Sequence, residues 1–284
     1  MPKLELDSAG VIHDHVTYQV DETPVQDLSR TPSHPTALVH RVVALGCPLV
    51  AVACYFVAGR PLWAMAILAV LSLAGYLSPA WRQTMAFPRA VFAFLTLTFV
   101  INTLGIAYPY SNIFVLTGLL GLFSLSGMEW KSLYFGSGKT AKWTKTALLV
   151  ALGLIGLILS VHFWQPTLLG NNPTPKDWPP DVILMMAIGY ATFSALMEET
   201  IFRGVLIAYG RACFRMEIAV VAQALIFAMM HYRVGFPMHA TGAALALFWG
   251  FGAGWLVTRA ESIYPAFLMH FVLVLILFLV LAFA

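Results

Sequence analysis

Apolar runs that approach 20 residues recur along this chain, and they constrain its fold more than any other feature. A helix rises 1.5 Å per residue, so about 20 apolar residues are needed to cross ~30 Å of hydrocarbon. Nine segments approach this length, with soft edges, at 41–59, 62–80, 89–107, 111–128, 146–164, 182–209, 217–231, 239–257 and 263–283. The fourth and seventh are short or interrupted by polar residues. We therefore expect an all-α, polytopic transmembrane bundle of eight or nine spans.

The composition excludes a soluble protein of the same length. Hydrophobic residues make up 60% of the chain and charged residues only 10%, whereas a soluble domain usually carries about a quarter charged residues. The surface of such a chain must be solvated by lipid, so the bilayer is its first partner. A net charge of +3 gives no reason to expect a nucleic-acid partner. No CxxC pair or Cys/His spacing typical of a zinc site occurs.

Lysine and arginine in the loops predict the orientation, because cytoplasmic loops carry an excess of both. The loop 129–145 holds four lysines and is therefore placed in the cytoplasm. Alternation of the spans then puts twelve basic residues on that side and three on the other. The N-terminus is predicted to be cytoplasmic, in an inner or plasma membrane. Residues 1–37 are polar and lack an early apolar run, so we interpret them as a mobile tail rather than a signal peptide.

Two adjacent acidic residues lie well inside an apolar span, in the run Met197 to Gly204. A carboxylate at such a depth costs roughly 2.5–3.5 kcal/mol unless it faces partners or water. Glu199 and Arg203 are four residues apart and share a helix face, so an ion pair between them is expected. Glu198 points about 100° away and has no such local cation. A structural ion network is the alternative, but Glu198 is the group left free for general acid–base chemistry.

Two histidines accompany this pair. His231 ends the segment 217–231, and His270 lies inside the last span. Either one alone would be interpreted as a core histidine. Together with an unpaired carboxylate, in three separate spans, they can orient a water molecule or stabilise an oxyanion.

At these residues the chain resembles the CPBP family of intramembrane glutamic proteases, which includes the type II CAAX endopeptidases. Glu198, Glu199 and Arg203 match its EExxxR motif, and Phe227 with His231 matches its FxxxH motif. The stretch from Phe248 through Gly250, Gly254, Thr258 and Pro265 to His270 is similar to its last conserved block. The resemblance implies a catalytic membrane core at 181–284, preceded by N-terminal transmembrane helices at 38–180.

The resemblance also implies a mechanism: hydrolysis of a peptide bond by water, without a metal, a cofactor or a covalent intermediate. Glu198 would be the general base, His231 would help position the water, and His270 would stabilise the oxyanion. Glu199 and Arg203 would support the site. The family often places Asn four residues after the last histidine, where this chain has Val274, which cannot donate a hydrogen bond. The implied partner is a peptide or protein at the membrane, prenylated or not.

Three alternatives remain open from the sequence. Val274 favours a catalytically inactive scaffold or immunity protein of the same fold. Intramembrane carboxylates and histidines also build proton relays, as in a proton-coupled transporter. In a third alternative, Glu198, His231 and His270 would ligate a metal, although the chain lacks the HExxH motif.

Overall fold

The computed structural model describes residues 35–107, 109–165 and 178–283. Most of the predicted tail 1–37 lies outside these residues, as do all of residues 166–177. Every described element is a helix or a turn; within these ranges no strand occurs. The main helices, listed with their bounds, are α1 (Pro35–Val52), α2 (Pro61–Leu77), α4 (Ala86–Thr103), α5 (Tyr110–Leu125), α6 (Thr140–Trp164), α7 (Pro180–Glu198), α8 (Ile207–Arg211), α9 (Met216–His231), α10 (His239–Ala260) and α11 (Tyr264–Phe283).

Each of the nine predicted apolar segments contains a helix. Six described helical stretches are long and apolar enough to cross a membrane, and α2, α5 and α9 are shorter apolar helices. Two of these three, α5 and α9, are the segments that the sequence marked as weakest. Large apolar side chains such as Leu62 (71% exposed) and Val70 (70%) lie on the outer surface, where lipid would cover them. The chain is an all-α integral membrane bundle.

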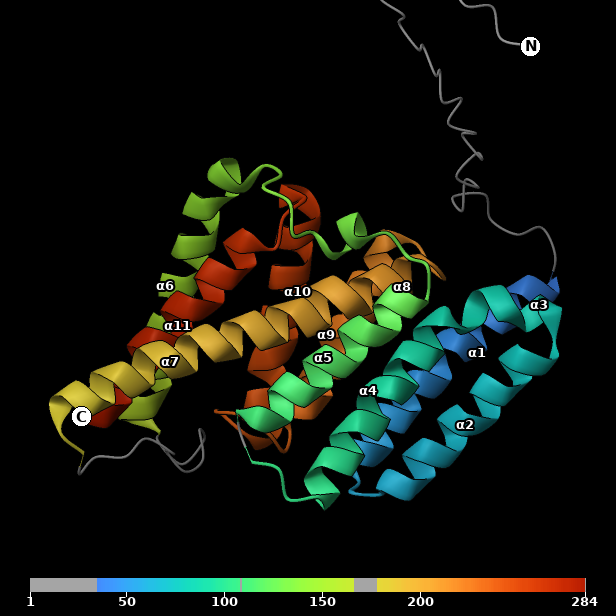
Figure 1. Cartoon of the computed structure of the whole chain (residues 1–284). Coiled ribbons are helices and arrows are strands. Elements are labelled where there is room, and N and C mark those ends of the chain that lie inside the picture. The colour runs from blue at the N-terminus through green and yellow to red at the C-terminus, as the bar shows by residue number, and fades with distance from the viewer. Residues whose placement is uncertain (1–34, 108, 166–177, 284) are drawn as a thin grey trace, which may run out of the picture. The chain divides into compact units, whose positions relative to one another are not determined.

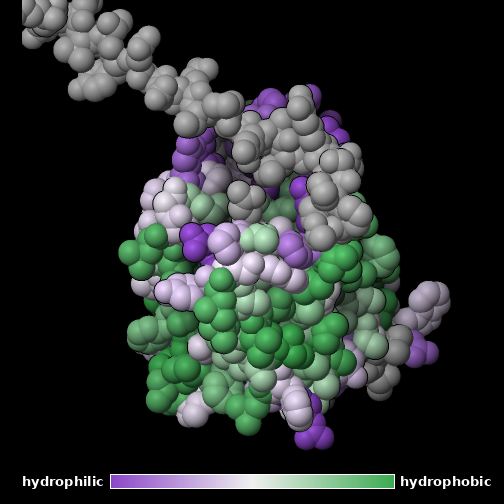
Figure 2. Space-filling view, turned by 90° about the vertical axis from the view of Figure 1, so that its right-hand side faces the viewer, coloured by the Kyte–Doolittle hydropathy of each residue, from purple (hydrophilic) through white to green (hydrophobic). Residues whose placement is uncertain are grey.

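The helices pack as two groups that meet at the long helical stretch beginning with α7. Figure 1 shows α1, α2 and α4 side by side on one flank and α6 and α11 on the other, while α10 packs mainly against α9. The stretch α7–α8, together with α5 and α9, lies between these flanks, and α11 packs against both α6 and α7. Figure 2 shows a broad apolar band on one face of the molecule, with hydrophilic residues concentrated toward one edge of it. Such a band fits a membrane-embedded bundle.

Small residues allow α9 and α10 to approach each other closely. A Cβ added at Gly250 would lie 3.0 Å from the Cα of Ala224, and one at Gly254 would lie 2.7 Å from Nε2 of Gln223. At these two positions the absence of a side chain therefore lets the helices pack closely. Gly252 faces open space instead.

Candidate active site

The helix that carries the acidic pair changes its winding at that point. α7 ends at Glu198, and a π-helical segment, η5 (Glu199–Leu206), continues it into α8 without a break. Short π-helical segments inside α-helices occur frequently at functional sites. Every residue of η5 is buried, which places this change of winding in the interior of the bundle.

Glu199 and Arg203 form an ion pair inside this buried segment. Arg203 Nη1 lies 3.3 Å from Glu199 Oε1, and the two side chains are 0% and 1% exposed. The Arg203 guanidinium also lies over the ring of Phe227, 4.4 Å from its centroid. The charge of the arginine is thus stabilised by a carboxylate and by the face of an aromatic ring. The pair expected from the four-residue spacing is present.

His270 links the two glutamates. Its Nδ1 lies 2.8 Å from Glu199 Oε1, and its Nε2 lies 3.9 Å from Glu198 Oε2. The histidine comes from α11, so the contact joins residues 71 positions apart along the chain. Trp249 of α10 packs edge-on against the imidazole, with the ring centroids 5.3 Å apart. The orientation of His270 is therefore determined by contacts on several sides.

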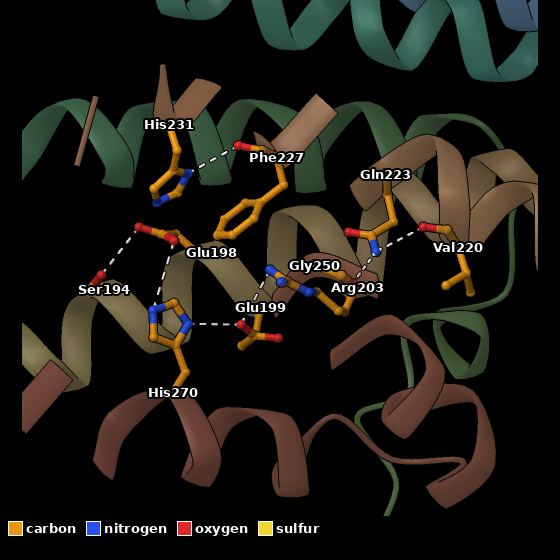
Figure 3. A network of polar contacts seen from close by, with 10 residues as sticks. All are labelled: Ser194, Glu198, Glu199, Arg203, Val220, Gln223, Phe227, His231, Gly250 and His270. Carbon is orange, nitrogen blue, oxygen red and sulfur yellow. Dashed lines mark hydrogen bonds and ion pairs between the residues drawn. The ribbon is translucent and has the colours of Figure 1, made fainter. Parts of the chain in front are cut away.

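Glu198 is the more accessible of the two carboxylates. Its side chain is 19% exposed, and the Ser194 hydroxyl donates a hydrogen bond to its Oε1 at 3.2 Å. Figure 3 shows the Glu198 carboxylate between the imidazoles of His231 and His270. Among the described residues, Glu198 forms no ion pair with an Arg or Lys, although Arg203 is close enough for an electrostatic interaction. This carboxylate is consequently the member of the pair that can receive a proton from a bound water.

His231 is held by the backbone of its own helix. Its Nδ1 lies 3.0 Å from the Phe227 carbonyl oxygen. A carbonyl can only accept, so Nδ1 donates and a neutral ring keeps Nε2 as an acceptor. Gly235 approaches the same ring, because a Cβ there would lie 3.0 Å from His231 Cδ2, and its φ of +100° suits glycine. The loop after α9 thus packs against the imidazole.

Three cavities border this cluster: one, of about 200 Å³, is lined by Glu199 and Thr200, and the other two differ in size. The smaller, of about 90 Å³, is lined by both imidazoles, and Trp249 and Val274 also contribute to its wall. The larger, of about 430 Å³, is lined by Glu198 and Ser194. The five predicted site residues therefore lie in one cluster: the carboxylate of Glu198 borders the larger cavity, the histidines border the smaller one, and the Glu199–Arg203 pair is buried behind them.

The sequence did not identify several residues that lie in or beside the site. Ser194 is four residues before Glu198, and this helical spacing could have identified it. Gln223 is fully buried and donates to the Gly250 carbonyl at 2.6 Å; an amide inside an apolar span was the available signal. No feature of the sequence pointed to Gly235, because its contact with His231 depends on how the loop after α9 folds back onto that helix. Among the described residues, no group of three or more His, Cys, Asp or Glu side chains has the arrangement of a metal site.

Comparison with known proteins gives one match in this region. Residues 180–276, about a third of the chain, match the family model described as Type II CAAX prenyl endopeptidase Rce1-like. This match confirms the family resemblance over the segment that carries all five predicted site residues. The family is one of helical membrane proteases. Neither the curated proteins nor the solved structures gave a significant match.

Proposed function

We propose that this chain, whose residues 180–276 carry the Rce1-like type II CAAX endopeptidase pattern, is an intramembrane endopeptidase that uses a water molecule as nucleophile. The family match supports a CAAX-type membrane protease in general. The glutamate–histidine mechanism rests on one further observation, the lone accessible carboxylate of Glu198 between two imidazoles.

Glu198 and His231 are suited to bind the attacking water from two directions. A carboxylate oxygen and the free Nε2 of His231 are both acceptors, so one water can donate a hydrogen bond to each. Its lone pair then points toward the carbonyl carbon of the substrate. As the C–O bond forms, the water proton passes to Glu198. The same proton is delivered to the leaving nitrogen when the C–N bond breaks, so the products are an amine and a carboxylic acid that keeps the second proton of the water. Transfer of this second proton to the amine then gives a carboxylate and an ammonium group.

His270 is suited to stabilise the oxyanion of the tetrahedral intermediate. Nδ1 donates to Glu199, so donation to the oxyanion from Nε2 requires the doubly protonated ring. The negative charges of Glu198 and Glu199 would then equal the positive charges of Arg203 and His270. A charged donor in a site that excludes bulk water is worth more than the same donor in water. Glu199 and Arg203 act in this proposal as positioning residues.

The second function that an observation favours is a catalytically inactive scaffold or immunity protein of the same fold. Val274 lines the smaller cavity where the family often supplies Asn, and its side chain has no donor. In this alternative the cluster would only connect helices. Both functions keep the lipid bilayer as a partner, but only the protease requires a peptide substrate.

Substitution of Glu198 tests the proposal directly. General-base catalysis contributes about 10²–10⁴-fold, so we expect Glu198→Gln and His231→Ala to lose at least 100-fold in cleavage. The termini of membrane proteins would be compared by mass spectrometry between cells with wild-type chain and cells with Glu198→Gln. Glu217→Gln, an exposed carboxylate at the start of α9, is the matched control. Cleavage products present at equal levels in wild-type and Glu198→Gln cells would contradict the mechanism. Absence of any cleavage product in wild-type cells would favour the scaffold.

We further propose that residues 181–284 form the catalytic core and that the chain lies in a cell inner or plasma membrane with its N-terminus in the cytoplasm. The lysines of the loop between α5 and α6 support this orientation.

A further inference from the structure

The larger cavity beside Glu198 is built from two parts of the chain. One wall comes from α7, η5 and the end of α9, all inside the segment that matches the protease family. The opposite wall comes from α4 and α5, which precede that segment by more than 50 residues. Helices outside the family pattern therefore determine much of the shape of the space that the proposed general base faces.

Neutral polar side chains mark the α4–α5 wall. Asn102 lies in the last turn of α4 and Asn112 in the first turn of α5, so the two carboxamides flank the connection between these helices. Thr98 and Ser111 also line the cavity. Among the described residues of its lining, Glu198 is the one with a charge. The remainder of the wall is apolar and includes Phe94 and Val115.

The sizes of the two cavities indicate which of them can receive a substrate. About 90 Å³ beside the histidines can hold a few water molecules but no peptide segment. About 430 Å³ beside Glu198 lies in the range of ligand sites, which is about 300–1,000 Å³. A peptide therefore has to approach the cluster from the side of α4 and α5.

We propose that this cavity binds an extended, uncharged segment of the substrate and that Asn102 and Asn112 bind its main chain. The proposal rests on the proposed protease function, because it assigns a substrate class to the same site. The Asn102 side chain also hydrogen-bonds Tyr55. A carboxamide has donors and acceptors at several positions, so each asparagine can still match N–H and C=O groups that an unpaired peptide strand presents. Apolar walls and a single carboxylate disfavour acidic side chains, because like charges in a poorly hydrated site repel strongly.

Cleavage of a fluorogenic peptide library by the purified full-length protein in proteoliposomes tests this binding role. We expect Asn102→Ala and Asn112→Ala each to lower kcat/KM about five- to tenfold, the size of a lost hydrogen bond, mainly through KM. Thr103→Ala and Phe114→Ala are the matched controls. Thr103 bonds its own helix, and Phe114 is 55% exposed away from the cavity. Both controls are expected to stay within about twofold of wild type.

A charge substitution gives a readout that a purely structural role would not produce. Asn112→Asp adds a second carboxylate to the cavity, so peptides with Lys or Arg near the cleaved bond should gain about tenfold relative to uncharged peptides. Thr103→Asp, at the neighbouring exposed position, should leave this preference unchanged.

The outcomes separate the two proposals. If Asn102 and Asn112 variants cleave like wild type with the same sequence preference, while Glu198→Gln is inactive, the substrate-binding role is wrong and the protease function stands. If Glu198→Gln cleaves normally, the proposed mechanism at Glu198 is wrong; if wild type cleaves no peptide, the protease function itself is wrong. If the preference for Lys or Arg near the cleaved bond rises in Asn112→Asp but not in Thr103→Asp, the result supports both the substrate-binding role and the protease function.

Discussion

The two neighbouring carboxylates of the site have different environments. Glu199 is buried and paired with Arg203 and His270. Glu198, one residue earlier, is partly exposed; Ser194 donates a hydrogen bond to it, and His270 lies at longer range. Pairs of titratable groups with divergent environments commonly divide into a reacting group and a supporting group. The two residues should therefore respond differently to substitution.

Val274→Asn tests whether the missing amide limits the reaction. The new side chain would line the smaller cavity beside His270 and could donate to an oxyanion there. Removal of one such donor costs about 10²–10³-fold in other enzymes, so we expect kcat to rise at least tenfold with KM little changed. Val274→Leu, which adds volume but no donor, serves as the control. Cleavage that stays undetectable in both variants and in wild type would favour the scaffold.

Arg203→Ala tests the supporting role of the buried pair. Removal of one partner leaves Glu199 buried without its cation, which typically costs about 3–5 kcal/mol. The melting temperature of the protein in detergent should therefore fall by several degrees. Arg215→Ala removes an exposed partner of Glu217, at 3.7 Å, and an exposed pair contributes about 0–1 kcal/mol. Equal melting temperatures for the two variants would show that the buried pair does not stabilise the fold.

At the element scale, the turn between α10 and α11 is tied to the start of α6. The Lys139 backbone N–H donates to the Ala260 carbonyl, and its side chain pairs with Glu261. The Thr140 hydroxyl donates to Ser262 at 2.9 Å. Ile263 N–H donates to the Tyr134 carbonyl at 2.9 Å. These bonds fix the first turn of α11, six residues before His270, and so help to position the imidazole.

The Lys139–Glu261 pair predicts a pH dependence of this junction. The hydrogen bond and charge of Lys139 lower the pKa of Glu261 below its ordinary value of 4.5. A carboxyl with a lowered folded pKa stabilises the fold above its unfolded pKa, and this contribution is lost as the pH falls through the folded pKa. Proteolysis at this turn should therefore become faster below about pH 4.5 in wild type. In Glu261→Gln it should already be fast at pH 7, and an identical profile for both proteins would contradict the prediction.

The spacing of residues along the sequence predicted the helices better than it predicted the contacts between them. The Glu199–Arg203 pair follows from four residues on one helix, and the nine apolar segments follow from the width of a bilayer. Contact between Glu198 and His270 depends on how α7 packs on α11, which no local pattern encodes. The π-helical winding of η5 was not predicted either, because its sequence also suits an α-helix. Asn102 and Asn112 gave no signal, since a polar residue near a span end usually faces water.

At the scale of the whole molecule, orientation determines which side of the membrane supplies the substrate. The lysine-bearing loop and the Asn102–Asn112 connection lie at opposite ends of α5. If the lysines are cytoplasmic, as the basic residues predict, the Asn102 end of the larger cavity faces the opposite side. A substrate would then enter the larger cavity from the outer side of the membrane.

Labelling of single cysteines in intact cells tests this orientation. The three native cysteines, Cys47, Cys54 and Cys213, would first be replaced by alanine. A cysteine at exposed Ser137, in the lysine-bearing loop, should react with a membrane-impermeant maleimide only after permeabilisation. A cysteine at exposed Thr103, next to Asn102, should react in intact cells. The reverse pattern would invert the bundle and direct the cavity toward the cytoplasm, so that a cytoplasmic peptide tail rather than an outer segment would have to be the substrate.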